Sequence, residues 1–594
     1  MRPIPLFLAS LFLATASLAQ QVTDSVAPEA ATISGLLRIS EEVEAAYAAR
    51  NAGQPVTAQS WMISAANPLA VSAGAKILRE GGSAADAMVA AQLVLGLVEP
   101  QSSGLGGGAF LVWYDAQSGE LTTLDGRETA PLAATPTLFQ DDTGEPLGFF
   151  DAVVGGRSVG TPGTPALLEA AHRRWGRTPW PDLFEAGIAL AEDGFAVSPR
   201  LAALVARDAE RLGRWESTAA YFLPGGAPLE EGAILRNPEY AATLRHMAEQ
   251  GAQAFYTGPI AADIVRTVQG AEGNPGLLSA VDLALYQVKE REAICAPFRA
   301  MQVCGMGPPS SGALTVGQIL GILNSFDLAA LGPDSPEAWR LIGDASRLAF
   351  ADRGRYMADS DFVPIPTEGL IEPAYLDERS MMLERADALP EATPGEPPWD
   401  HAQLWADDVS IELPSTSHIS IVDSYGNVLS MTTTIENAFG SRLMVRGFLL
   451  NNELTDFSFR THINGLPIAN RLEPGKRPRS SMSPTIVMKD GAPILAIGSP
   501  GGSRIIGFVA KTIIAWADWG LNMQEAVSLP HAVNRFGTYD LEEGTGAAAL
   551  QSGLEALGYE VSLRPLTSGL HAIEIGQVLR GAADPRREGI ALGE

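Results

Sequence analysis

The chain has 594 residues, of which 46% are hydrophobic and 19% are charged, and its formal net charge is −28. This composition is typical of a globular protein with enough apolar residues for a large core. Such an acidic surface repels the phosphate backbone of nucleic acids, and no basic block interrupts the sequence, so binding to nucleic acid is not expected.

The first residues predict a secretory signal peptide. The stretch "MRPIPLFLASLFLATASLAQQ" has one arginine, an apolar run, and small residues at Ser17 and Ala19. This arrangement is typical of a signal that is cleaved before Gln20. We therefore expect residues 1–19 to be removed and the protein to be periplasmic or secreted, with no stable membrane span. An uncleaved N-terminal anchor is the alternative.

In chain order, apolar periodicity first predicts two helices, one capped by Asn67 and stopped by Gly81, and the next capped by Ser83. A glycine loop then leads into a strand, "SGLGGGAFLVWYD", and a second strand lies in "LTTLDGRETAP". Residues 160–270 are predicted to be largely helical. Strands return at 287–306, and the segment "LTVGQILGILNSF" predicts another helix.

The glycine loop "GLGGG" is not a dinucleotide-binding motif, because its glycine spacing differs and it leads into a strand instead of a helix. The sequence also has no Walker A loop, no H-E-x-x-H and no G-x-S-x-G motif. None of the seven histidines lies in a recognisable Ser-His-Asp context, although a triad assembled in space stays open.

The two cysteines, Cys295 and Cys304, lie nine residues apart. They are too few for a structural zinc site, which takes four ligands. In an oxidising compartment they could form a disulfide between two short strands, and otherwise they would be separate buried thiols. The sequence leaves both states open.

Residues 388–413 are acidic, rich in proline and poorly periodic, which predicts an exposed linker or a mobile end. Directly afterwards, "SHISIVD" and "VLSMTTTI" alternate about the turn "SYGN" and predict a hairpin, and "PTIVMKDGAPILAIG" predicts a second one. The segments "SRIIGFVAKTIIAWADWG" and "LNMQEAVSLPH" predict helices. Strand pairs and buried helices in both halves predict layered sheets covered by helices.

Thr416 opens the first of these strands. If the chain were cut before it, the freed α-amine would have a reference pKa of about 7.7–8.0 and could activate the hydroxyl of the same residue. Gly501 and Gly502, at the start of the apolar helix, are candidate oxyanion-hole donors. Ser480 and Ser481 lie beside three cationic residues and could hold a carboxylate. Taken singly, these residues also fit an ordinary strand start, a strand-to-helix turn and a solvated basic loop.

Seven segments carry a resemblance to a known family. In chain order they are "GGSAADAMVAAQLVLGLVEPQSSGLGGGAFLVWYD", "LDGRETAP", "MGPPSSGA", "TSHISIVDSYGNVLSMTTTIENAFG", "FLLNNELTDFS", "GKRPRSSMSPTIV" and "GSPGGSRII", and they span about residues 60 to 590. Together they resemble the γ-glutamyltransferase family of N-terminal nucleophile hydrolases. The resemblance implies an α/β protein with a four-layer αββα fold, made as an inactive precursor. The precursor would cleave itself between Ser415 and Thr416, and the subunits 20–415 and 416–594 would stay together as a heterodimer.

The resemblance also implies an activity. Thr416, supported by Thr434 and by oxyanion-hole donors at Gly501 and Gly502, would attack a γ-glutamyl amide such as glutathione and form a γ-glutamyl ester. Water, an amino acid or a peptide would then take the acyl group, with no metal or organic cofactor. A cephalosporin (glutaryl) acylase of the same fold and an uncleaved binding protein are the alternatives.

Substrate recognition is implied for a further set of residues. By motif, Arg127 matches the arginine that binds the substrate α-carboxylate, with Ser480 and Ser481 as its hydroxyl partners. Asp456 matches the carboxylate that receives the α-ammonium group.

Three features depart from the enteric bacterial members of the family. Glu436 and Glu453 stand in the implied ammonium pocket, where those enzymes have Asn and Gln, and they resemble the residues of Bacillus-type members. The added acidity should favour a substrate that carries an ammonium group over a glutaryl group. The loop between Asp456 and Lys476 is shorter than the enteric lid and lacks its tyrosine, which predicts a more open site. Arg479 replaces the leucine that usually precedes the two serines.

Overall fold

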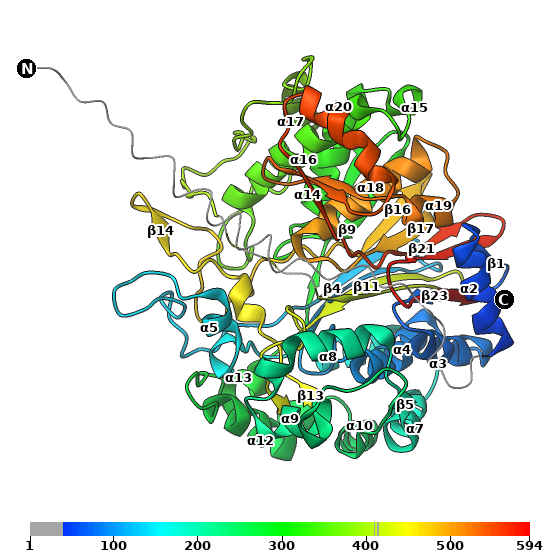
Figure 1. The fold of residues 1–594 in the computed structure, drawn as a ribbon, viewed down its shortest axis with the longest axis vertical. Coiled ribbons are helices and arrows are strands. Elements are labelled where there is room, and N and C mark those ends of the chain that lie inside the picture. Colours follow the sequence, from blue (N-terminus) through cyan, green and yellow to red (C-terminus); the bar gives the residue numbers. More distant parts are fainter. Residues whose placement is uncertain (1–39, 409, 411, 413–414) are drawn as a thin grey trace, which may run out of the picture.

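The computed structural model of the chain describes residues 40–408, 410, 412 and 415–594. Two seven-stranded sheets lie face to face, and helices cover the outer face of each sheet (Figure 1). This arrangement confirms the predicted four-layer αββα fold. The predicted signal peptide, residues 1–19, lies outside the described residues.

The first sheet combines strands from both sides of Thr416 in sequence. All its pairings are antiparallel. Because strands before Thr416 pair with strands after it, their shared hydrogen bonds would hold the two predicted subunits together after a cut. The strands in spatial order are β1 (Val56–Ala58), β22 (Leu579–Ala583), β21 (His571–Ile575), β17 (Ala492–Gly498), β16 (Thr485–Lys489), β9 (Met301–Met306) and β8 (Ala293–Phe298).

The second sheet contains the strand that follows Thr416. The predicted hairpin is confirmed, and its register places Ser417 opposite Thr433. Thr416 therefore lies beside the end of the neighbouring strand. The strands in spatial order are β23 (Ile590–Gly593), β2 (Met62–Ala65), β10 (Ser417–Val422), β11 (Val428–Thr434), β3 (Gly108–Tyr114), β4 (Leu121–Gly126) and β7 (Lys289–Arg291).

Helices α3 (Pro68–Arg79) and α4 (Ala84–Val98) cover the second sheet. Their predicted caps are confirmed, because the side chains of Asn67 and Ser83 accept backbone N–H groups of the first turns. Every residue of α4 is buried, as its apolar composition on all sides requires. The first sheet is covered by α14 (Gly312–Ile322), α16 (Pro336–Tyr356), α18 (Ile505–Ala517) and α19 (Met523–Ser528).

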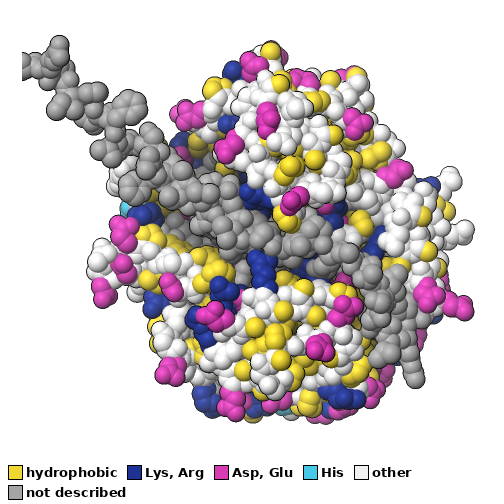
Figure 2. All heavy atoms as spheres, in the orientation of Figure 1, with side chains coloured by type: hydrophobic (Ala, Val, Ile, Leu, Met, Phe, Trp, Pro, Cys, Tyr) yellow, Lys and Arg dark blue, Asp and Glu magenta, His cyan; other side chains and the backbone are white. Residues whose placement is uncertain are grey.

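The segment predicted to be mainly helical forms an outer group of helices beyond α4 (Figure 1). These helices are α6 (Thr164–Trp175), α7 (Glu185–Asp193), α8 (Pro199–Leu212), α9 (Glu216–Phe222), α10 (Pro238–Gln250), α11 (Gln253–Tyr256) and α12 (Gly258–Gln269). Within the described residues, no helix is both long and apolar enough to cross a membrane. On the face drawn in Figure 2, Asp and Glu side chains lie mostly around the margin, and several Lys and Arg side chains lie nearer the middle.

Two details settle expectations from the sequence. Cys295 and Cys304 face each other across β8 and β9 and form a disulfide. Residues 388–408 contain no helix or strand, as expected, but Leu389 and Trp405 are buried. The prediction of an exposed linker is therefore wrong at these positions, because both side chains join hydrophobic clusters of the fold.

Candidate active site

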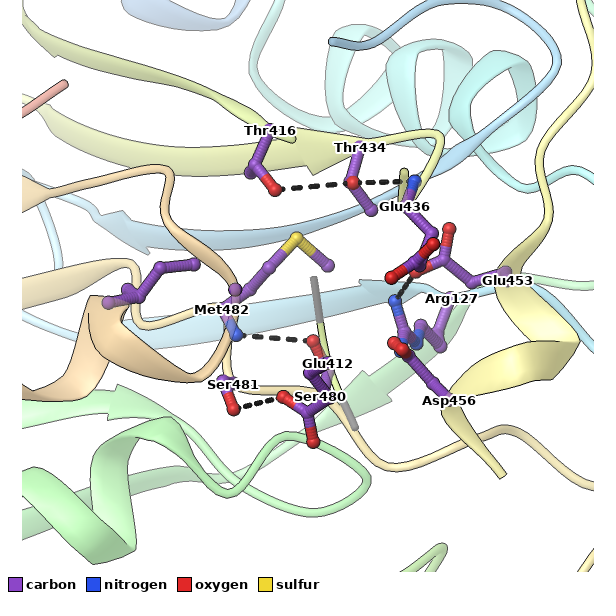
Figure 3. Close-up of a pocket in the computed structure, with 12 residues that line it drawn as sticks. Arg127, Glu412, Thr416, Thr434, Glu436, Glu453, Asp456, Ser480, Ser481 and Met482 are labelled. Atoms are coloured by element: carbon purple, nitrogen blue, oxygen red, sulfur yellow. Dashed lines mark hydrogen bonds and ion pairs between the residues drawn. The ribbon is translucent and has the colours of Figure 1, made fainter. Parts of the chain in front are cut away.

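One cavity brings together most of the residues that the sequence singles out (Figure 3). Gly501 adjoins this cavity through Gly502 without lining it. The lining contains the predicted residues Arg127, Thr416, Thr434, Glu436, Glu453, Asp456, Ser480, Ser481 and Gly502, together with Glu412, Met482 and Ile505.

Ends of strands and short turns supply these side chains. Thr416 directly precedes β10, and Thr434 ends β11. Arg127 follows β4, and Glu453 and Asp456 lie in the 3-10 turn η7 (Glu453–Asp456). Residues distant in sequence meet because both sheets end at this cavity.

The peptide bond before Thr416 is the centre of the site. Thr416 Oγ lies 2.6 Å from the carbonyl oxygen of Ser415, and the Thr434 hydroxyl donates to the same oxygen at 2.8 Å. Thr434 Oγ in turn accepts the backbone N–H of Glu436 at 2.8 Å. Two hydroxyls thus meet at one peptide carbonyl, an arrangement that suits one hydroxyl for attack and the other for polarising the carbonyl.

Contacts on both sides hold this peptide bond in place. The Ser415 hydroxyl donates to the carbonyl of Gln101 at 2.7 Å, and Arg587 donates to the carbonyl of Thr416 at 3.0 Å. The glycine loop also takes part, because a Cβ at Gly107 would lie 1.9 Å from the carbonyl oxygen of Thr434. The glycine loop therefore lets the backbone of Thr434 come close to that of Gly107, and this approach positions Thr434.

The two candidate oxyanion-hole glycines have backbone angles that favour glycine. The φ angles are 142° at Gly501 and 58° at Gly502, both in a region that other residues rarely adopt. A Cβ at Gly501 would also meet the ring of Phe508 at 2.7 Å. The glycines do not start the apolar helix directly, as the sequence suggested, because the turn η8 (Gly502–Arg504) precedes α18.

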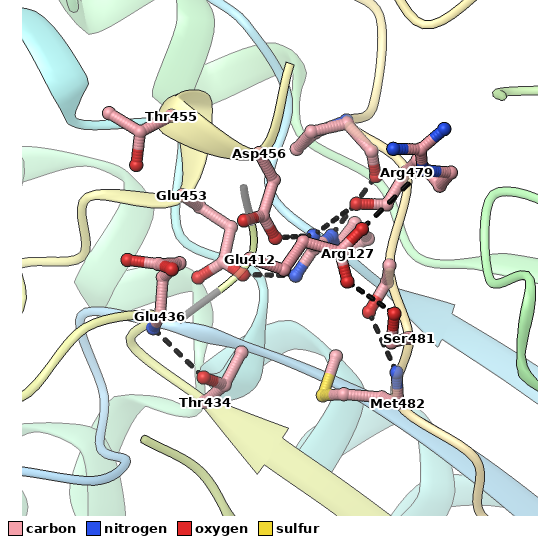
Figure 4. Close-up of polar contacts among 12 residues, drawn as sticks. Arg127, Glu412, Thr434, Glu436, Glu453, Thr455, Asp456, Arg479, Ser481 and Met482 are labelled. Atoms are coloured by element: carbon pink, nitrogen blue, oxygen red, sulfur yellow. Dashed lines mark hydrogen bonds and ion pairs between the residues drawn. The ribbon is translucent and has the colours of Figure 1, made fainter. Parts of the chain in front are cut away.

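Arg127 forms a buried cluster with acidic residues (Figure 4). Its Nη1 is paired with Glu453, and its Nη2 lies 2.5 Å from Asp456. Nη2 also donates to the carbonyl of Arg479 at 2.8 Å, and Nε donates to that of Pro478 at 3.2 Å. Much of the hydrogen-bonding capacity of this guanidinium is therefore committed within the protein.

The pKa shifts in this acidic cluster follow from burial and from the ratio of charges. Burial raises the pKa values of Glu128, Glu453 and Asp456, although Arg127 opposes the shift in each. Burial alone would lower the pKa of Arg127, but Glu453 and Asp456 outweigh it, and the net pKa is raised. Arg127 is thus charged, and one guanidinium cannot balance three ionised carboxylates, so the cluster holds protons more tightly than free carboxyl groups do.

A second cluster surrounds Glu412. Its carboxylate accepts hydrogen bonds from Ser481 and Arg353, and Nε of Arg479 lies 3.4 Å away. Arg479 also pairs with Asp408 at 2.9 Å. Burial alone would raise the pKa of Glu412, but Arg353, Arg479 and the Ser481 hydroxyl lower it overall, so Glu412 is held as a carboxylate.

The described contacts group the recognition residues differently from the resemblance. Arg127 has no described contact with either predicted hydroxyl partner: Ser481 binds Glu412, and Ser480 Oγ accepts the backbone N–H of Met482 at 3.1 Å. The recognition roles stay predictions. Sequence reasoning missed Glu412 because it lies in an aperiodic run.

Comparison with known proteins shows which family the chain resembles over most of its length. A model of the gamma-glutamyltranspeptidase family matches residues 70–594. The glutathione hydrolase proenzyme of Bacillus subtilis (strain 168) is 38% identical over 550 residues, which cover 90% of this chain and 91% of that protein. The acylase ACY 1 proenzyme of Pseudomonas sp. (strain SE83) is 34% identical over 547 residues, covering 90% and 94%. The crystal structure of a cephalosporin acylase from Bacillus halodurans matches with a TM-score of 0.80 at 26% identity, over 91% of this chain and 97% of the other.

Proposed function

The chain belongs to the gamma-glutamyltranspeptidase family, and from this premise we propose that it is a self-cleaving γ-glutamyl hydrolase and transferase with Thr416 as nucleophile. The observation that carries the proposal is the meeting of two hydroxyls at one peptide carbonyl. Thr416 Oγ and Thr434 Oγ lie 2.6 Å and 2.8 Å from the Ser415 oxygen. An ordinary strand start does not require this arrangement.

Self-cleavage would begin with attack of Thr416 Oγ on the carbonyl carbon of Ser415. The bond from that carbon to the Thr416 nitrogen breaks, the nitrogen takes up the hydroxyl proton, and Ser415 becomes esterified to Thr416. Thr434 stabilises the negative charge that develops on the Ser415 oxygen. Water then hydrolyses the ester and leaves subunits 20–415 and 416–594, which the interleaved strands hold together as a heterodimer.

Turnover would use the same hydroxyl. The freed α-amine of Thr416, with a reference pKa of about 7.7–8.0, accepts the hydroxyl proton as Oγ attacks a γ-glutamyl amide. Backbone N–H groups at Gly501 and Gly502 stabilise the oxyanion, and the amine of the leaving group departs with the proton. Water, an amino acid or a peptide then takes the glutamyl group from the ester. Glutathione is the expected donor, because the Bacillus subtilis relative is named as its hydrolase.

Recognition of the donor would depend on its charged α-amino acid group. Arg127 with Ser480 and Ser481 is proposed to bind the α-carboxylate, and Asp456 is proposed to bind the ammonium group. Buried acidic side chains in the same cavity support an ammonium site, because a cation relieves their mutual repulsion.

Export is part of the proposal. The N-terminal sequence predicts removal of residues 1–19 and release into the periplasm or the medium. N-terminal sequencing of the larger fragment tests this prediction, and a fragment that still begins at Met1 would contradict it.

A glutaryl acylase is the second candidate, because an acylase proenzyme and a cephalosporin acylase structure are both similar to the chain. The two functions differ in one group, since a glutaryl substrate lacks the α-ammonium. Rates on a γ-glutamyl anilide and on a glutaryl amide distinguish them. We expect the γ-glutamyl compound to react faster, and a faster glutaryl reaction would favour the acylase.

Self-cleavage is tested by denaturing gel electrophoresis of the purified protein. We expect two bands, the smaller with the N-terminal sequence Thr-Ser-His-Ile-Ser. Thr416→Ala should give one full-length band, and the exposed control Thr135→Ala should still give two. A single wild-type band would refute self-cleavage, and two bands from Thr416→Ala would show that another group makes the cut.

A further inference from the structure

We propose that Arg353 and Arg479, together with Ser481, form a carboxylate-binding subsite beside the cavity. The chain's own Glu412 fills this subsite before cleavage, and the α-carboxylate of the donor fills it afterwards. The inference rests on the proposed function, to which it adds two arginines that the family resemblance does not assign. It also makes Glu412 an internal ligand that the substrate must replace.

The subsite already holds a carboxylate in this structure (Figure 4). Arg353 and Ser481 both donate to Glu412, and Arg479 lies 3.4 Å from it. Arg353 also donates to Ser481 at 2.7 Å and to Ser311 at 2.8 Å. These contacts fix the guanidinium and the hydroxyl in place around the carboxylate, which is the pre-organisation that anion recognition requires.

Arg127 is less available to a carboxylate than these two residues. Its Nε and Nη2 donate to backbone carbonyls, and Glu453 and Asp456 occupy the remaining approach. A guanidinium has five N–H donors in a fixed plane, and these contacts use four of them, so Arg127 alone offers little to a further carboxylate. Additional donors are needed, and Ser481 in the cavity lining, with Arg353 bonded to it, can supply them.

Charge balance gives a second reason. Arg353, Arg479, Glu412 and Asp408 are all at least 90% buried, and their charges cancel while Glu412 is present. Removal of Glu412 leaves one more positive than negative charge among these four buried residues, and loss of one partner of a buried ion pair is unfavourable. A substrate carboxylate restores the balance.

The position of the subsite suits a donor that reacts at Thr416. Glu412 and Ser481 line the same cavity as Thr416 (Figure 3). Arg353 and Arg479 do not line it, and they meet the cavity through Glu412 and Ser481. Glu412 also precedes Thr416 by four residues, so cleavage before Thr416 places it near the new end of the large subunit. The cut therefore removes the covalent link that keeps the internal carboxylate near the nucleophile.

Binding to the uncut protein tests the occupancy. The Thr416→Ala variant keeps Glu412 in place, and isothermal titration with L-glutamate should show at least about tenfold weaker binding than Thr416→Ala/Glu412→Ala, the factor expected from loss of a charge-assisted contact. Thr416→Ala/Asp407→Asn is the matched control, because Asp407 is an exposed acid of the same segment, and it should behave like Thr416→Ala. Equal binding with and without Glu412, or no binding to either variant, overturns the proposal.

Kinetics of the cut enzyme test the arginines. Arg479→Leu and Arg353→Lys should raise KM for a γ-glutamyl anilide about tenfold or more and change kcat less. Arg355→Gln, at a partly exposed arginine of the helix that carries Arg353, should leave both unchanged. If the two arginines had only a structural role, the variants would unfold at a lower temperature without a larger change in KM than in kcat. Either that result or unchanged kinetics overturns the proposal. If the wild type does not hydrolyse the anilide, the proposed function fails, while the titrations of the uncut protein still decide the occupancy of the subsite.

Discussion

The two charged clusters of the cavity have opposite compositions. Around Arg127, one guanidinium meets three buried carboxyl groups, from Glu128, Glu453 and Asp456. Around Glu412, two guanidinium groups meet two carboxylates. Burial therefore raises carboxyl pKa values in the first cluster, whereas arginine holds the pKa of Glu412 low in the second.

The difference shows that the sign of the charge a buried site can accept follows from all the charged groups around it, and not from one ion pair alone. Arg127 is one cation, yet its surroundings have a surplus of acid and can accept a further positive charge. The other cluster becomes cationic as soon as Glu412 leaves. A zwitterionic α-amino acid group, with an ammonium and a carboxylate on one carbon, matches this polarity across one cavity.

The largest expected effect comes from removal of the single cation in the acidic cluster. Arg127→Gln leaves Glu453 and Asp456 buried without a counter-charge, and the loss of one partner of a buried ion pair costs about 3–5 kcal/mol. Denaturant unfolding should show this loss near pH 8 and a smaller one near pH 5, because protonation relieves the carboxylates. Arg173→Gln, at an exposed arginine paired with Glu169, should change stability by less than about 0.5 kcal/mol. An equally small change for Arg127→Gln would show that the acidic cluster does not depend on its arginine.

The contrast between the clusters also marks the limit of prediction from sequence. The hairpin of β10 and β11 was predictable because alternation and its turn are local signals, and its register alone brings Thr434 to Thr416. The cluster around Glu412 was not predictable, because Glu412 comes from an aperiodic run and Arg353 comes from the helix α16. Only the tertiary fold joins them. The closeness of Gly107 to Thr434 was likewise invisible, since a glycine loop in sequence does not reveal which backbone approaches it.

A smaller effect is expected from loss of one carboxylate near the proposed ammonium site. Glu453→Gln keeps the size of the side chain but removes a charge, and hydrogen bonds to charged groups contribute about 1.5–3 kcal/mol. KM for a γ-glutamyl anilide should rise about tenfold or more, while the rate on a glutaryl amide should fall less or increase. Glu378→Gln, at an exposed position, is the control and should leave the ratio of the two rates unchanged. An unaltered ratio for Glu453→Gln would mean that this carboxylate does not select the ammonium group.

The last prediction concerns the pH dependence of stability in the same cluster. Burial raises the pKa of Glu128 well above its ordinary value, and the charge of Glu453 adds to the shift. Because the folded state holds this proton more tightly than the unfolded chain, Glu128 stabilises the fold fully at pH values below its ordinary pKa of about 4.3, and this contribution is lost as the pH rises. The free energy of unfolding of the wild type should therefore fall between pH 5 and pH 8.

Glu128→Gln cannot lose a proton, so its stability should fall less steeply over that range, by at most about 1.4 kcal/mol per pH unit for one group. Some slope should persist, because Glu453 and Asp456 have raised pKa values as well. Denaturant titrations at several pH values measure the two slopes, and Glu378→Gln should keep the wild-type slope. If Glu128→Gln kept it too, the proton would reside elsewhere in the cluster. The surplus of acid around Arg127 would then be carried by Glu453 and Asp456, the two residues that touch its guanidinium.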